Sequence, residues 1–222
     1  MTHQHQHAHG HAPAPTPNTP LSPADHWEQR YAGSDRVWSG KVNQALAAVV
    51  AGLAPGDSID LGCGEGGDVL WLAEQGWTAH GLDISETAVG RARAGATSRG
   101  LTTATFAATD LEAWEPERAS ADLVTASFFQ SDVPLERTRI LRRALTALRP
   151  GGHLVSVSHA APPSWADHHR ADMLGAAEEL AQLDLPTADW EVVTCEDRPR
   201  PAIAPDGSAG EHLDAVLVLR RR

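Results

Sequence analysis

The sequence predicts an α/β fold in which a doubly wound, mostly parallel sheet of seven strands ends in an antiparallel C-terminal hairpin. Three observations support this prediction. Strand-like segments alternate with helix-like segments, and such an alternation usually forms a parallel sheet covered on both faces. The stretch IDLGCGEGGD, residues 59–68, has the pattern of a strand, a glycine-rich turn and a helix. The last two strand-like segments have no helix between them, so they are expected to form a hairpin.

Composition divides the 222 residues into a tail and one domain. Residues 1–22 are rich in histidine and proline and have almost no apolar side chains to bury, so we expect this tail to be disordered. Its alternating histidines are either a metal-binding arm or a low-complexity or tag-like segment. With a hydrophobic content of 41% for the whole chain, residues 23–222 are expected to form a single domain with its own core.

Helical periodicity and capping residues place the helices. Ser22 followed by Pro23 is a typical helix start, Gly76 is a typical helix end, and Ser85 is placed to cap the helix that follows it. The sequence RPGG stops a later helix. Together these signals predict helices over residues 22–33, 41–53, 67–76, 86–100, 134–148 and 170–183.

Runs of apolar and β-branched residues between turn signals place the strands. The parallel strands are predicted over residues 58–62, 77–85, 102–110, 121–129 and 153–160. The hairpin is predicted from strands over residues 190–200 and 211–221, joined by the turn APDGSAG. In an open parallel sheet, ligands bind beyond the carboxyl ends of the strands, so the chemistry is expected there.

Charge and composition narrow the class of partner. The formal net charge of −11 opposes general binding to a nucleic-acid backbone. No apolar run approaches the ~20 residues that span a bilayer, and no apolar signal segment opens the chain, so we expect a cytoplasmic protein without membrane contacts. Cys63 and Cys195 are far apart in sequence and do not indicate a disulfide framework. For one domain of this size we expect a monomer or a homodimer.

The ends of the parallel strands carry Asp60, Asp83, Asp110, Ser127 and His159. Gly62, Gly64 and Gly67 satisfy the G-x-G-x-x-G spacing of dinucleotide-binding turns, which supports an NAD(P)-binding oxidoreductase. However, a pyrophosphate would face like-charge repulsion from Asp60 and from Glu65, a turn residue that we interpret as solvated. S-adenosylmethionine carries a sulfonium and an ammonium group and no phosphate, so its charge suits this turn.

Each residue type suits one part of S-adenosylmethionine. Gly62 and Gly64 allow the backbone to approach the methionine part closely. Asp83, which follows the first strand-end acid Asp60 by 23 residues, is placed to accept hydrogen bonds from both ribose hydroxyls. Asp110 is placed to accept a hydrogen bond from the adenine amino group, or else it caps the segment that follows.

The motifs and their order resemble those of the class I S-adenosylmethionine-dependent methyltransferases, whose fold is Rossmann-like. The matching segments are DLGCGEGGD, LDIS, ATDLEAW, ADLVTASF and LRPGGHLVSVSH, and the resemblance covers about residues 24–222. The lead-in DHWEQRYAGSDRVWSGKVNQAL is similar to that of small bacterial enzymes of the tellurite-resistance and thiopurine methyltransferase-like type. In such enzymes the lead-in covers the cofactor, which implies that Tyr31 and Trp38 contact the cofactor or the substrate.

The resemblance implies further residues beside the cofactor. Its motifs add Cys63, Ile84, Leu111 and Ser127 to the positions expected to contact S-adenosylmethionine. Cys63 lies inside the turn and is expected to be structural and not nucleophilic. No metal site is predicted for catalysis.

His159 lies next to the expected methyl-transfer centre. It is a general base, a residue that orients the substrate, or a strand-end histidine bonded to a nearby carbonyl. The pair His168 and His169 is interpreted as part of a solvated loop. We predict methyl transfer to a small-molecule acceptor, a soft nucleophile such as a thiol, a thiopurine or a chalcogen oxyanion. The alternatives are the NAD(P)-binding oxidoreductase and a non-catalytic metal- or metalloid-binding protein on the same fold.

Overall fold

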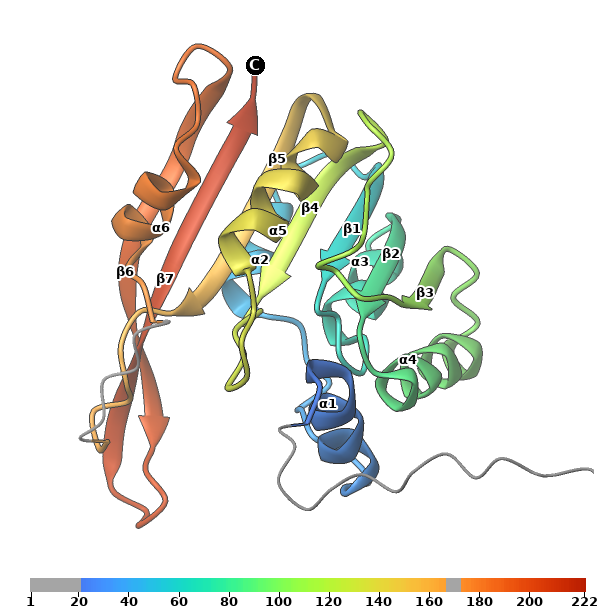
Figure 1. Ribbon diagram of the computed structural model, residues 1–222, viewed down its shortest axis with the longest axis vertical. Coiled ribbons are helices and arrows are strands. Elements are labelled where there is room, and N and C mark those ends of the chain that lie inside the picture. The colour runs from blue at the N-terminus through green and yellow to red at the C-terminus, as the bar shows by residue number, and fades with distance from the viewer. Residues whose placement is uncertain (1–20, 167–172) are drawn as a thin grey trace, which may run out of the picture.

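A computed structural model of the chain, which describes residues 21–166 and 173–222, contains one sheet with the strand order β3-β2-β1-β4-β5-β7-β6 (Figure 1). Strands β1 to β5 are parallel to one another, and β7 pairs antiparallel with both β5 and β6. The strands are β1 (Asp57–Leu61), β2 (Thr78–Asp83), β3 (Ala104–Ala108), β4 (Ala121–Ser127), β5 (Leu148–His159), β6 (Trp190–Ile203) and β7 (Ala209–Arg221). The helices are α1 (Pro23–Ala32), α2 (Gln44–Val50), α3 (Gly67–Glu74), α4 (Glu86–Arg99), α5 (Arg137–Ala144), the short 3-10 helix η1 (Leu145–Ala147) and α6 (Ala176–Leu183). The predicted fold class is confirmed.

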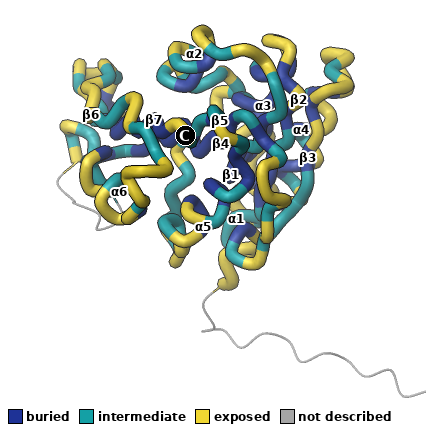
Figure 2. Tube along the Cα trace, turned by 90° about the horizontal axis from the view of Figure 1, so that it is seen from above, coloured by how far each residue is buried: buried dark blue, intermediate teal, exposed yellow. Residues whose placement is uncertain are grey.

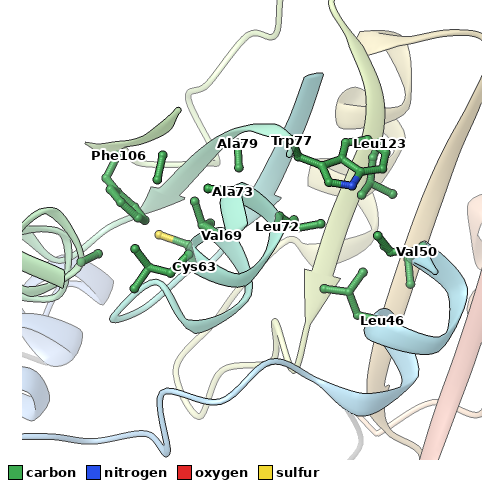
Figure 3. Close-up of a cluster of buried hydrophobic side chains, with 14 of the residues drawn as sticks. Leu46, Val50, Cys63, Val69, Leu72, Ala73, Trp77, Ala79, Phe106 and Leu123 are labelled. Atoms are coloured by element: carbon green, nitrogen blue, oxygen red, sulfur yellow. The ribbon is translucent and has the colours of Figure 1, made fainter. Parts of the chain in front are cut away.

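The sheet separates two apolar cores, because neighbouring residues of a strand point to opposite faces. Helices α2, α3 and α4 pack on one face against residues such as Leu123 and Val218, together with the fully buried Trp77 (Figure 3). Helices α5 and α6 pack on the other face against the next residues of the same strands, Val124 and Leu219. Figure 2 shows the buried strands between more exposed helices and loops, as expected for a doubly wound fold.

The structure differs from the sequence prediction around the fifth strand and the hairpin. The preceding helix ends before the RPGG motif, because α5 stops at Ala144 and η1 at Ala147, and β5 begins at Leu148 and not at residue 153. A register shift against β4, between Ala121 and Leu123, absorbs the extra residues, as a β-bulge does. Both hairpin strands are also longer than predicted, so the turn between them shrinks to residues 204–208.

Three sequence predictions lie wholly or partly outside the described residues. Residues 1–20 of the tail, the pair His168 and His169, and the start of the helix predicted over residues 170–183 fall there. Those predictions remain predictions, but the predicted helix is wrong for residues 173–175, because Gly175 is the N-cap of α6, which begins at Ala176. In the part of the chain that the structure does describe, every helix is too short or too polar to cross a bilayer.

The effect of truncating the tail is expected to depend on Ser22, the N-cap of α1, whose hydroxyl accepts a hydrogen bond from the Asp25 N–H at 3.1 Å. A chain that starts at Leu21 is expected to keep the Tm and the S-adenosylmethionine affinity of the full chain, while losing any nickel or zinc binding by the tail. A chain that starts at Pro23 also lacks the cap, so its unfolding free energy is expected to be about 1 kcal/mol lower. Thermal denaturation and ligand titration of both chains provide the test. A large loss of stability in the longer chain would contradict the prediction.

Candidate active site

The turn between β1 and α3 has a backbone that glycine adopts more easily than other residues. Gly62, Gly64 and Gly66 have φ angles of 67°, 52° and 82°. A Cβ atom would lie 2.5 Å from the ring of Phe129 if placed on Gly62, and 2.9 Å from the Tyr31 hydroxyl if placed on Gly64. The turn therefore requires these glycines for its own geometry and packing, before any ligand is considered.

Three carboxyl groups are buried around this turn. Asp60, Asp68 and Asp83 are 4%, 9% and 7% exposed, and none of them forms an ion pair within residues 21–166 and 173–222. Burial raises the pKa of Asp60 well above its usual value, and the charges of Asp68 and Asp83 raise it further. Burial also raises the pKa values of Asp68 and Asp83. A positively charged ligand would relieve this repulsion, whereas a phosphate would increase it.

Hydrogen bonds hold two of these carboxyl groups in place. The hydroxyl of Thr125, on β4, donates to Oδ1 of Asp60 at 2.6 Å. The backbone N–H of Asn43 donates to Oδ1 of Asp68 at 2.7 Å. Asp68 is not among the site residues predicted from the sequence, because the helix dipole favours an acid in the first turn of any helix, whether or not a ligand binds there.

Asp83 connects the turn to the start of α4. Its Oδ2 accepts a hydrogen bond from the Gly64 N–H at 2.8 Å, and its Oδ1 accepts one from the Ser85 N–H at 2.9 Å. An ionised carboxylate has about four acceptor positions, so two backbone bonds leave capacity for ribose hydroxyls. The prediction that Asp83 holds the ribose therefore stands beside a structural role that the sequence did not reveal.

The other predicted cofactor residues occupy different environments. Asp110 is exposed, and its Oδ1 accepts a hydrogen bond from the backbone two residues later at 2.9 Å, which is a capping contact. Leu111 packs in the core, whereas Ile84 and Ser127 are half-buried at the ends of their strands. Cys63 is buried, and its burial raises the pKa of the thiol well above its usual value, as expected for a structural cysteine.

Glu65 is a structural contact, so the interpretation of it as a solvated turn residue is wrong. Its side chain is 6% exposed, and its Oε1 forms an ion pair with Arg91 at 3.0 Å. Its Oε2 accepts hydrogen bonds from the N–H groups of Val37 and Trp38 at 3.1 and 3.0 Å. The lead-in segment folds back over the turn and removes Glu65 from water.

The aromatic residues of the lead-in lie over the glycine turn. Nε1 of Trp38 donates a hydrogen bond to the hydroxyl of Tyr31 at 2.8 Å, and both side chains come close to Gly64. Burial, followed by the charge of Asp83, raises the pKa of the Tyr31 hydroxyl. Trp38 is 46% exposed and so remains accessible to a ligand, and its contact with the cofactor or the substrate stays a prediction.

Helix α1 lies at the carboxyl ends of the parallel strands (Figure 1). Its side chains form hydrogen bonds on two sides of the site. On one side, Glu28 accepts hydrogen bonds from the hydroxyls of Ser85 and Thr87, and these bonds lower the pKa of Glu28. On the other side, Nε1 of Trp27 donates to the hydroxyl of Ser131 at 3.2 Å. The helix thus covers the region between the ends of β2 and β4.

His159, the candidate catalytic residue, is half-buried at the end of β5. Its Nδ1 lies 3.2 Å from Oδ1 of Asp214, which is its partner in the register of β5 and β7. The ring of Phe128 stacks on it with the ring centroids 4.5 Å apart. The ring is therefore bonded to a carboxylate and not to a carbonyl. Within the described residues, no three His, Cys, Asp or Glu side chains are grouped to hold a metal ion.

The segment that forms this site is similar in sequence to a known family and to several curated proteins. Residues 59–152 match the family model described as a methyltransferase domain. The chain is 34% identical over 113 residues to the 2-heptyl-1-hydroxyquinolin-4(1H)-one methyltransferase of Mycobacteroides abscessus. It is 30% identical over 162 residues to the ribosomal RNA small subunit methyltransferase C of Alcanivorax borkumensis, and 30% identical over 135 residues to the probable thiol methyltransferase 2 of Arabidopsis thaliana.

The three matches cover 50%, 67% and 59% of the chain and 50%, 48% and 60% of the relatives. The chain thus spans about half the length of the curated relatives that it matches. A solved structure reported as "Conversion of a Disulfide Bond into a Thioacetal Group during Echinomycin Biosynthesis" is 25% identical, with a TM-score of 0.68, over 89% of this chain and 92% of that chain.

The matched region begins in the strand that leads into the glycine turn and includes the ends of β2 and β4. The family match therefore includes the buried acids, and the similarity in fold extends over most of the domain. Residues 59–152 therefore carry a methyltransferase domain, and the chain resembles the class I S-adenosylmethionine-dependent methyltransferases in sequence and in fold.

Proposed function

We propose that this chain transfers a methyl group from S-adenosylmethionine to a small-molecule acceptor that is a soft nucleophile: a thiol, a thiopurine or a chalcogen oxyanion. The observation that carries the first half of the proposal is the cluster of Asp60, Asp68 and Asp83, three buried carboxyl groups without a cationic partner among the described side chains. S-adenosylmethionine, the methyl donor of this family, supplies a sulfonium-activated methyl group and two positive charges.

Different residues of the site are assigned to different parts of S-adenosylmethionine. Asp60 and Asp68 are assigned to its positive charges, and Asp83 to its ribose hydroxyls. Gly62 and Gly64 have no side chain, so the donor can approach their backbone closely. Their positive φ angles are present without a ligand, so the turn does not have to rearrange to bind it. The cluster also counts against an NAD(P) cofactor, whose pyrophosphate would be repelled by the same carboxylates.

The protein itself then has to align the two reactants and exclude water. Good alignment of reacting atoms is worth about 7–11 kcal/mol. Helix α1, which includes Tyr31, and Trp38 after it are placed over the turn to provide this cover. Phe128 is 36% exposed at the end of β4 and is assigned to the wall of the acceptor site, while Phe129 packs against the turn.

Sulfur chemistry supports a soft acceptor. One curated relative is named as a probable thiol methyltransferase, and the similar solved structure concerns a disulfide that becomes a thioacetal. The hydroxyquinolone and ribosomal RNA relatives take other acceptors, so family membership alone does not choose among them. The net charge of −11 opposes binding to RNA, which favours a small molecule for this chain.

Two measurements test the proposal. Equilibrium dialysis with labelled S-adenosylmethionine and labelled NAD is expected to show binding of the first only. Methyl transfer is then measured with thiols, thiopurines, tellurite and selenite, beside catechols and amines, with formation of S-adenosylhomocysteine as the readout. We expect turnover with members of the first group. Turnover confined to hydroxyl or amine acceptors would overturn the soft-nucleophile assignment, and binding of NAD alone would overturn the whole proposal.

A further inference from the structure

The C-terminal hairpin brings charged residues to the end of β5. Strands β6 and β7 continue past the last residue of β5 towards the end of the molecule where α1 lies (Figure 1). Arg200 on β6 and Asp214 on β7 both lie in this part of the hairpin, and Asp214 faces His159. The hairpin thus forms one side of the region that the acceptor would occupy.

The contacts of Asp214 favour one tautomer of a neutral His159 ring. Nε of Arg200 donates to Oδ2 of Asp214 at 2.5 Å, and Nη2 donates to Oδ1 at 3.2 Å. Burial acts to raise the pKa of Asp214, but hydrogen bonds from His159 and Arg200 bring it below its usual value. An ionised carboxylate only accepts hydrogen bonds, so Nδ1 of a neutral His159 carries the proton and Nε2 has a free lone pair.

Two consecutive phenylalanines connect this histidine to the donor turn. The ring of Phe129 lies against Gly62, and the ring of Phe128 stacks on His159 with centroids 4.5 Å apart. Phe128 has a positive φ angle of 53°, which is unusual for a bulky residue and marks a backbone held by its surroundings. The side chain of His159 is 31% exposed, so a ligand beside the turn has access to it.

We propose that Asp214, held by Arg200, positions His159 with Nε2 ready to take a proton from a methyl acceptor, so that the chain methylates thiols that arrive protonated. This inference rests on the proposed function. The thiol proton passes to Nε2, the electron pair left on the acceptor sulfur forms the bond to the methyl carbon, and the pair of the broken carbon–sulfonium bond stays on the donor sulfur. His159 then returns the proton to water.

The charged and titratable groups around His159 bear on the pH dependence of the reaction. Among the described residues, the charged and titratable groups that face it are Asp214, Arg200 and His212, whose ring centroid lies 5.1 Å away. Burial and the charge of Arg200 lower the pKa of His212, which keeps that ring neutral near pH 7. The pH profile of the rate with a protonated thiol is therefore expected to differ between the wild type and Asp214→Asn.

The test compares two acceptors in the full chain. An alkyl thiol is mostly protonated near pH 7, whereas an aryl thiol of low pKa is already ionised. In single-turnover methyl transfer, Asp214→Asn is expected to lower the rate with the alkyl thiol by at least about 10²-fold and the rate with the aryl thiol by less than about 10-fold. Glu191→Gln is the matched control, because it removes the carboxylate of an exposed ion pair with Arg220 at the other end of the same hairpin.

A second readout does not depend on turnover. Nitrogen-15 NMR of the wild-type imidazoles is expected to show His159 as the Nδ1–H tautomer, and Asp214→Asn is expected to change this signature and the pH profile together. An Nε2–H tautomer in the wild type, or equal losses with both thiols, would overturn the inference alone. Failure of the wild type to methylate either thiol would overturn the inference alone, and failure with every soft nucleophile of the acceptor panel would overturn the proposed function with it.

Discussion

Replacing Asp83 with alanine is expected to weaken S-adenosylmethionine binding by about 2–3 kcal/mol, which is roughly a 30- to 150-fold rise in Kd. The variant loses charge-assisted hydrogen bonds to the ribose hydroxyls. It also loses the two backbone contacts that hold Gly64 and Ser85, at 2.8 and 2.9 Å, so the turn itself becomes less ordered. Isothermal titration calorimetry measures the affinity.

Two controls make the result on Asp83 specific. Glu74→Ala removes a carboxylate from the end of α3, where it forms an exposed ion pair with Arg99, and surface pairs of this kind contribute about 0–1 kcal/mol to stability. It is expected to bind S-adenosylmethionine as the wild type does. The Tm of both variants shows whether they are folded. A folded Asp83→Ala protein with unchanged affinity would contradict the ribose assignment.

Gly66→Ala is expected to lower the free energy of unfolding by about 2–5 kcal/mol. Gly66 has a φ angle of 82°, and an L-residue in left-handed backbone costs about 1–2 kcal/mol. An added Cβ would also lie 2.8 Å from Cβ of Ala92 and 2.8 Å from the ring of Phe106, and overpacking of this kind costs about 1–3 kcal/mol. Urea denaturation measures the loss.

Gly90 provides the matched control for Gly66. It lies inside α4, its φ angle is not in the left-handed region, and a Cβ placed on it has nothing within 4 Å. Gly90→Ala is therefore expected to stabilise the protein by about 0.5–1 kcal/mol, because alanine is the better helix former. If Gly66→Ala were as stable as the wild type, the close packing of the turn would be refuted.

The donor side of the molecule could be predicted from sequence because its signals are local. The glycines, the strand that precedes them and the acids at the strand ends stand within motifs of a few residues, so Asp60 and Asp83 were recognised. Asp60 and Asp83 are close together because neighbouring parallel strands end at the same edge of the sheet. Asp68 belongs to the same motif and was missed because an acid in a first helical turn is common without any ligand.

The remaining contacts depend on residues that are distant in the chain. Glu65 was interpreted as solvated because nothing beside it in sequence indicates Arg91, 26 residues later. Asp214 is 55 residues from His159, and their contact depends on the register of β5 and β7. A shift of one residue would turn Asp214 to the other face of the sheet, and no pattern in the sequence determines that register to one residue.

Under the proposed assignment, the C-terminal hairpin carries the part of the acceptor site that contains His159's partners, and it follows the donor-binding turn along the chain. The match to the family ends at residue 152, before His159, Arg200 and Asp214, so the inherited donor-binding region and the proposed acceptor-binding region are encoded in succession. Because β6 lies at the sheet edge, insertions or substitutions in the hairpin leave the neighbours of β1 and β2 in place. Under the proposed assignment, evolution can exchange the last third of such a chain to reach new acceptors while the methyl donor stays the same.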